Sequence, residues 1–233
     1  NAVFAITALL FISVKLIKNL KHKNKILLSF MVAYPVISYF LLLGGLGILP
    51  IVETYKLGGL MLTLIIASFG IIISFPIGIL LALGRQSELS TVRFFSVMYI
   101  EFIRAVPLIT ILFMASNVLP LFFDSGISMD KLVRALIAIT LFQAAYMAEV
   151  VRGGLQAIPK GQYEAADAIG LSYYQKNILI VLPQALKISI PNIAGSSISL
   201  FKDTTLVLII GLMDFLAVVT GAAADKEWLG RHL

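Results

Sequence analysis

Long apolar runs, separated by short polar segments, dominate the sequence. A membrane-spanning helix needs about 20 largely apolar residues, and six stretches approach or exceed that length: 2–17, 26–49, 59–84, 94–123, 132–151 and 178–224. The last stretch is too long for one crossing and contains Pro183, Pro191 and the polar pair Lys202 and Asp203. We therefore expect it to kink, re-enter or leave the bilayer. The pattern predicts an all-α fold, a polytopic bundle of transmembrane helices.

The composition fits a chain whose solvent is mostly lipid. The sequence is 60% hydrophobic and 13% charged, with a mean hydropathy of +1.00, whereas soluble domains average about 45–50% apolar and about 25% charged residues. A net charge of +6 would indicate nucleic-acid binding in a soluble protein. Here the cations lie in short loops beside apolar runs, so we assign them to membrane orientation and expect membrane lipid, not nucleic acid, as a partner.

Lysine and arginine residues are concentrated in alternate loops. One set of loops holds five lysines between Lys15 and Lys25, then Arg85 and Arg93, and then Arg152, Lys160 and Lys176; the other set holds Lys56, Lys131 and Arg134. The positive-inside rule places the richer set in the cytoplasm. The polar segment 152–176 is therefore predicted to be cytoplasmic, while Glu53 and Ser125 are expected outside.

The sequence offers little for covalent catalysis. It has no cysteine, which excludes disulfides, thiol nucleophiles and cysteine-bound zinc. Its two histidines, His22 and His232, lie far apart in polar stretches and make a poor metal site. No Gly-rich loop followed by Lys and Ser or Thr is present. We therefore expect no enzyme activity, metal or cofactor in this chain, and any ATP chemistry must come from a partner.

The cytoplasmic segment has the pattern of a short helix–turn–helix. Pro159 and Gly161 should end the preceding helix, and residues 162–169 are good helix formers. Gly170 supplies a left-handed turn, after which Ser172 can cap a second helix. Small side chains would let another backbone approach closely: Ala165, Ala166 and Ala168. On shape alone, a simple amphipathic connector explains the segment equally well.

The spacing within this segment resembles the ATPase-docking loop of ABC importer permeases. The signature is Glu-Ala-Ala, three residues, Gly, nine residues, Ile, one residue and Leu-Pro. It falls on Glu164, Ala165, Ala166, Gly170, Ile180, Leu182 and Pro183. The resemblance implies that most of these residues, together with Gly161, form the contact with an ABC ATPase.

Four further segments resemble the polar amino-acid branch of the same family: 59–64, 100–108, 144–154 and 201–206. The resemblance implies a type I ABC importer permease-like core over 58–233, with its docking loop at about 153–177. Residues 1–57 would be two extra transmembrane helices, similar to the long Aap, Bzt and Nat permeases for general or polar L-amino acids. The family's final helix is missing before Leu233, and the chain starts at Asn1, so we interpret the sequence as a segment of a longer protein.

The resemblance implies a function as the permease subunit of an ATP-driven importer of L-amino acids in the bacterial cytoplasmic (inner) membrane. Its partners would be an ABC ATPase dimer that binds ATP and Mg, a second permease subunit that is identical or homologous, and an extracytoplasmic amino-acid-binding protein. The alternative is a secondary transporter or channel for small polar solutes. That reading needs an internal repeat or a relay of ionisable groups, and we find no clear repeat.

Charged residues within apolar runs require partners or water. Glu101 and Arg104 are three residues apart and thus share one helical face, and Glu149 and Arg152 repeat this spacing. We expect each pair to form a structural ion pair near the cytoplasmic interface.

The candidate substrate pathway contains Lys202, Asp203, Thr204, Asn117 and Gln143. An L-amino acid carries a carboxylate that Lys202 could match and an ammonium that Asp203 could match. Unwound backbone near Pro191 and Gly195 would add hydrogen-bond donors. The alternative for Lys202 and Asp203 is an internal ion pair that supports a kink, and helix–helix hydrogen bonds explain Asn117 and Gln143 equally well.

Overall fold

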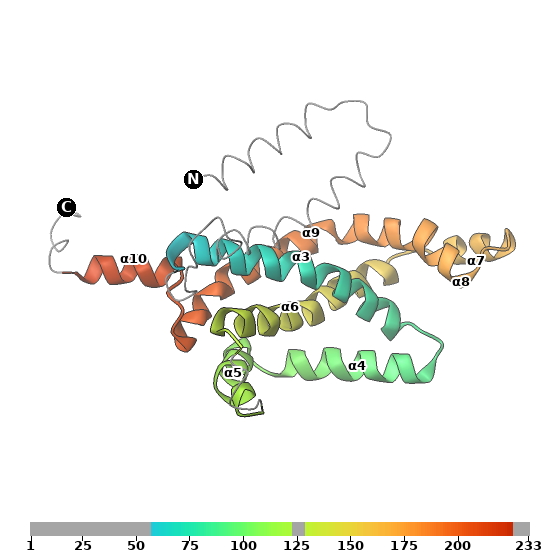
Figure 1. Cartoon of the computed structure of the whole chain (residues 1–233). Coiled ribbons are helices and arrows are strands. Elements are labelled where there is room, and N and C mark those ends of the chain that lie inside the picture. Colours follow the sequence, from blue (N-terminus) through green and yellow to red (C-terminus); the bar gives the residue numbers. More distant parts are fainter. Residues whose placement is uncertain (1–56, 123–128, 226–233) are drawn as a thin grey trace, which may run out of the picture.

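The computed structural model describes residues 57–122 and 129–225, and these ranges are helical apart from connecting turns and one isolated bridge. The two N-terminal helices expected over 1–57 lie almost entirely outside the described residues. So do Glu53 and Ser125, which were expected on the outer side of the membrane. The long helices run roughly side by side, with α7 (Lys160–Ala168) and α8 (Tyr173–Lys176) at one end and α10 (Phe215–Ala224) at the other (Figure 1).

Two long helices form the centre of the bundle. These are α3 (Gly59–Arg85) and α6 (Lys131–Gln156), which cross closely because Gly78 on α3 has no side chain. A Cβ atom at Gly78 would lie 2.7 Å from Cβ of Met147 on α6. Met147 and Ile139 are fully buried here. Both helices agree with the predicted apolar runs.

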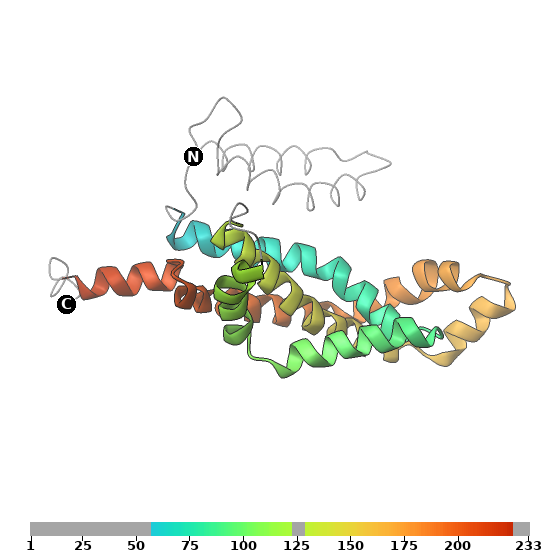
Figure 2. The ribbon, with the colours of Figure 1, turned by 60° about the horizontal axis from the view of Figure 1, so that its bottom comes forward.

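The apolar run predicted over residues 94–123 is broken in the structure. It is divided into α4 (Ser90–Ala105) and a second piece made of α5 (Leu108–Phe113), η2 (Met114–Val118) and η3 (Leu119–Phe122), and the two pieces meet at 99° (Figure 2). Pro107 causes the break, because proline disfavours helical backbone in the residue before it. Val106 is accordingly extended, with φ −103° and ψ 131°.

The chain then passes through the polar segment predicted to be cytoplasmic, which contains α7 (Lys160–Ala168) and α8 (Tyr173–Lys176). Next come η4 (Asn177–Val181), α9 (Leu182–Asp203) and η5 (Thr204–Ile210). From α8 onward they form a helical run of 38 residues, Tyr173–Ile210. At 1.5 Å per residue it is roughly 57 Å long, so it extends well beyond a hydrocarbon layer of about 30 Å.

The expected unwinding near Pro191 is wrong, because Pro191 and Gly195 both lie inside α9. The apolar stretch over 178–224 is interrupted further along, after η5. There Gly211 adopts a left-handed conformation with φ 77°, and Asp214 caps α10 (Phe215–Ala224) by accepting hydrogen bonds from two backbone amides. The α10 helix then extends away from the bundle (Figure 1).

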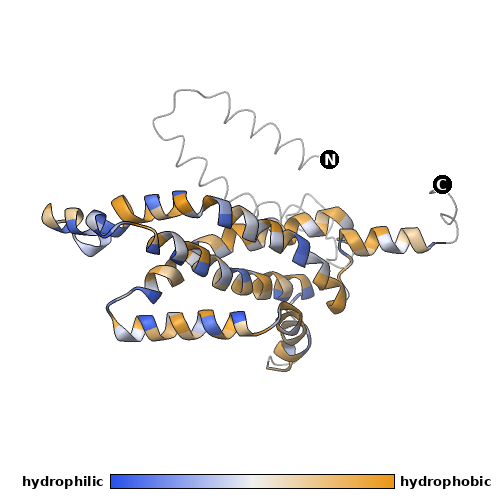
Figure 3. Ribbon diagram, turned by 180° about the vertical axis from the view of Figure 1, so that it is seen from behind, coloured by the Kyte–Doolittle hydropathy of each residue, from blue (hydrophilic) through white to orange (hydrophobic). Residues whose placement is uncertain are grey.

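Three helical runs of the described residues are long and apolar enough to cross a membrane: Gly59–Arg85, Lys131–Gln156 and Tyr173–Ile210. The bent pair Ser90–Ala105 and Leu108–Phe122 makes a fourth if it counts as one span. Hydrophobic residues are frequent along most of the helices (Figure 3). Leu80, Phe102 and Leu179 are each at least 65% exposed, as expected for side chains that face lipid.

Candidate functional sites in the polar loop and the helix bundle

The helix–turn–helix predicted from the sequence is present. Gly170 has φ +74°, in the left-handed region. Ser172 begins α8 with a reciprocal capping arrangement, in which its hydroxyl accepts from the Gln175 amide and the Gln175 side chain accepts from the Ser172 amide. Gly161 differs from expectation: it lies inside α7, because that helix already begins at Lys160, after Pro159.

Three side-chain contacts hold this segment in place: one joins α7 to α8, and two join α7 to α6 and α9. The Tyr163 hydroxyl donates to the Leu155 carbonyl at 3.4 Å, and burial raises the pKa of Tyr163, so the hydroxyl keeps its proton. Lys176 Nζ lies 2.6 Å from Asp167 Oδ1. Gln184 Nε2, on α9, donates to Gln162 Oε1, on α7, at 2.9 Å. The loop and the start of α9 are thus held together.

The residues of the docking signature divide between an open and a packed side. Glu164, Ala165 and Gly170 are exposed, whereas Ala166 is only 1% exposed and faces its own chain. Leu182 packs against the buried cluster at this end of the bundle, and Pro183 is exposed at the start of α9. The open side is the one available to another protein.

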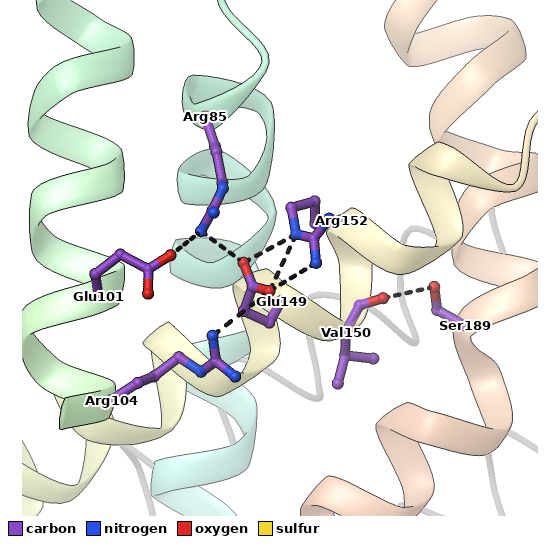
Figure 4. A network of polar contacts seen from close by, with 7 residues as sticks. All are labelled: Arg85, Glu101, Arg104, Glu149, Val150, Arg152 and Ser189. Carbon is purple, nitrogen blue, oxygen red and sulfur yellow. Dashed lines mark hydrogen bonds and ion pairs between the residues drawn. The ribbon is translucent and has the colours of Figure 1, made fainter.

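A network of ion pairs joins α3, α4 and α6 near the same end. Glu149 on α6 is its centre and lies within ion-pair distance of three arginines: Arg85 at 2.9 Å, Arg152 at 2.9 Å and Arg104 at 3.5 Å (Figure 4). Arg85 also contacts Glu101 at 2.8 Å. The predicted pairing of Glu149 with Arg152 is confirmed.

The predicted pairing of Glu101 with Arg104 is wrong. Although both lie on α4, Glu101 pairs with Arg85 of α3, and Arg104 pairs with Glu149 of α6. In the sequence, Arg85 was interpreted only as one of the cations that set the orientation of the chain in the membrane. Its role in the network depends on helix packing that brings Arg85 and Glu149 together across 64 residues.

A cavity of about 660 Å³ lies between α4, α6 and α9. Its polar lining includes Arg104, Gln143, Tyr146, Glu149, Ser196 and Asp203. Gln143 Nε2 donates to Ser196 Oγ at 2.9 Å across the helix pair. The Arg104 guanidinium lies 5.6 Å from the centre of the Tyr146 ring, which is within cation–π range. The cavity therefore offers hydrogen-bonding groups and charge between apolar helices.

The expected pathway residues do not form one site. Gln143 and Asp203 line the cavity, but Lys202 is exposed and lies outside its lining. Thr204 is buried and donates to the Phe201 carbonyl, while Asn117 donates to the Phe113 carbonyl one turn earlier. Within the described residues, the structure records no ion pair between Lys202 and Asp203 either, so the alternative of a kink-supporting pair also fails.

The chain belongs to a family described as "Binding-protein-dependent transport system inner membrane component", which matches residues 74–224. Membership of a family of inner-membrane transport components agrees with the resemblance found in the sequence. The polytopic helical fold is confirmed as well, because a solved structure of an amino acid ABC transporter with histidines has a similar chain. That likeness has a TM-score of 0.64 at 28% identity and covers 72% of this chain and 78% of the other.

Two curated relatives are similar over most of this chain. One is the inner membrane amino-acid ABC transporter permease protein YhdY of Escherichia coli, 55% identical over 91% of this chain and 58% of its own length. The other is the glutamate/glutamine/aspartate/asparagine transport system permease protein BztC of Rhodobacter capsulatus, 54% identical over 79% of this chain and 43% of its own length. The chain thus spans about half the length of these relatives.

Proposed function

We propose that this chain is part of the permease subunit of an ATP-driven ABC importer that carries L-amino acids across the inner membrane. The family assignment supports a transport role, and the names of the two relatives support amino acids as cargo. The importer would include an ABC ATPase dimer that binds ATP and Mg, a second permease subunit and an extracytoplasmic amino-acid-binding protein. The chain itself would perform no covalent chemistry.

The observation that carries this proposal is the mechanical link between the loop and the cavity. The open side of α7 presents Glu164 and Ala165, while Gln162 of the same helix is hydrogen-bonded to Gln184 of α9. Further along, α9 contributes Ser196 and Asp203 to the cavity wall. A displacement of the loop by an ATPase would therefore reach the cavity through one continuous helix, and it would favour whichever state the ATPase contacts better.

The experiment is to purify the full-length protein with its partners and compare two tryptophan variants. Ala165→Trp places a bulky group on the open side of α7, whereas Glu88→Trp places it on the exposed turn between α3 and α4, at the same end of the bundle. We expect Ala165→Trp to abolish co-purification of the ATPase and amino-acid-stimulated ATP hydrolysis, and Glu88→Trp to retain both. ATP-independent uptake driven by an ion gradient would instead support the secondary transporter or channel.

A further inference from the structure

The negative charge of Glu149 is balanced without all three of its arginine neighbours. Arg152 binds both of its carboxylate oxygens, with three nitrogen–oxygen distances of 2.9–3.0 Å. Arg85 donates to Glu149 at 2.9 Å and to Glu101 at 2.8 Å, which joins the two carboxylates. These two arginines already balance the two glutamates, so Arg104 adds a net positive charge to the network.

Arg104 is also the least tightly held of the three arginines. Its closest approach to Glu149 is 3.5 Å, compared with 2.9 Å for Arg85 and for Arg152. Its other contact is the face of the Tyr146 ring. Neither contact uses the planar set of N–H donors that makes arginine suited to binding a carboxylate through two parallel hydrogen bonds.

This surplus charge faces the cavity. Among the three arginines of the network, Arg104 alone lines the cavity, and its side chain is 35% exposed. Lys202, the cation that the sequence analysis placed in the substrate pathway, lies outside the lining. The lining also holds the carboxylates of Glu149 and Asp203 beside neutral Gln143 and Ser196. Among the described lining residues, Arg104 is therefore the one cation that could bind the carboxylate of a ligand.

We propose that Arg104 binds the carboxylate of an amino-acid ligand in this cavity and leaves Glu149 when it does so. The proposal rests on the proposed function as an amino-acid importer and adds the residue that recognises the ligand. Glu149 would stay compensated by Arg85 and Arg152, so its charge would not be left unpaired in the membrane. Ligand binding would break the ion pair between Arg104 of α4 and Glu149 of α6. It would keep the ion pair between Arg85 of α3 and Glu149.

The test uses the purified complex with its ATPase, without the binding protein, so that only the membrane site selects the ligand. The probes are L-glutamine and L-glutaminamide, which differ only in that a neutral amide replaces the α-carboxylate. We expect the unmodified complex to bind L-glutamine at least tenfold more tightly than the amide. Arg104→Gln should weaken L-glutamine binding about tenfold and remove the discrimination between the two probes.

Arg104→Lys serves as a second variant if Arg104→Gln fails to assemble. It keeps the positive charge beside Glu149 but loses the two parallel donors, so binding of L-glutamine should weaken severalfold in a complex that melts at an unchanged temperature. If either folded variant still prefers L-glutamine over L-glutaminamide as strongly as the unmodified complex does, Arg104 does not bind the carboxylate. The same conclusion follows if the unmodified complex binds neither probe. ATPase co-purification is a separate readout: its absence would refute the proposed function itself.

Discussion

Gly154 on α6 lies so close to Ser189 on α9 that a methyl group on Gly154 would overlap the Ser189 hydroxyl and the Ala185 carbonyl oxygen. The Ser189 hydroxyl donates to the Val150 carbonyl at 3.2 Å, one turn earlier on α6 (Figure 4). Small residues allow membrane helices to approach closely enough for such contacts. This contact sets the spacing of α6 and α9, the two helices that form most of the cavity wall.

Gly154→Ala should therefore destabilise the bundle, and Gly153→Ala provides a matched control. Alanine at 154 must push α6 and α9 apart, at a cost of about 1–3 kcal/mol. Alanine at 153 meets no atom within 4 Å and gains the same helix propensity, about 1 kcal/mol. Thermal unfolding in detergent should show a lower melting temperature for Gly154→Ala and an equal or higher one for Gly153→Ala. Equal melting temperatures for the two variants would contradict the close contact.

The ion-pair network predicts unequal effects for its two glutamates. The Glu149 side chain is 16% exposed and faces three arginines, whereas the Glu101 side chain is 54% exposed and pairs with Arg85 alone. Glu149→Gln should cost on the order of 3 kcal/mol, because it leaves half-buried cations uncompensated. Glu101→Gln should cost less than about 1 kcal/mol.

The measurement is the yield and melting temperature of the protein in detergent at low and high salt. Salt should recover part of the loss for Glu101→Gln, since exposed charges are screened, and little of it for Glu149→Gln. Comparable losses in the two variants would remove Glu149 from the centre of the network.

Hydropathy predicted the long straight helices well because lipid selects apolar side chains on every exposed turn. The bounds of α3 and α6 follow the apolar runs closely. The division of the stretch after Ser90 was missed, although its signal, Val106 followed by Pro107, stands in the sequence. Run length alone cannot separate one straight crossing from two apolar helices that meet at 99°.

The sequence predicted contacts within one helix but not contacts between helices. Spacing of three residues found the pair Glu149 and Arg152, since one helix determines it. The same rule failed for Glu101 and Arg104, because partners on other helices bind them more closely. Likewise, the adjacent residues Lys202 and Asp203 were assigned to one pocket, but neighbours on a helix point about 100° apart, and only Asp203 lines the cavity.

The orientation of the bundle can be tested by cysteine labelling, because the sequence contains no cysteine. Lys160 stands at the start of α7, the end expected in the cytoplasm, and Ser125 is expected on the opposite side of the membrane. A membrane-impermeant maleimide added to intact spheroplasts should label Ser125→Cys and spare Lys160→Cys until the membrane is opened. Labelling of Lys160→Cys from outside would reverse the orientation and place the proposed docking loop beyond the reach of a cytoplasmic ATPase.

Gly170 gives the sharpest test of the loop itself, since its requirement is one of backbone conformation. Its φ of +74° is a conformation that costs other L-residues about 1–2 kcal/mol, yet a Cβ there would meet no atom within 4 Å. Within this chain, Gly170→Val should therefore act through the conformation of the turn and not through a collision of its Cβ. We expect normal membrane insertion, because the apolar helices are unchanged, but weakened ATPase binding and loss of amino-acid-stimulated hydrolysis.

Gly170→Asn is the matched control, since asparagine tolerates the left-handed conformation better than other residues with side chains. It should keep most of the ATPase binding that Gly170→Val loses. A bulky substitution of Ala166 is a poorer test, because Ala166 is buried in its own chain and its replacement would disturb α7 directly. ATPase pull-down and amino-acid-stimulated hydrolysis on the purified complex should thus rank Gly170→Asn above Gly170→Val. If both variants behave like the unmodified protein, the turn between α7 and α8 does not position a partner, and the match to the docking signature between Glu164 and Pro183 has no mechanical role.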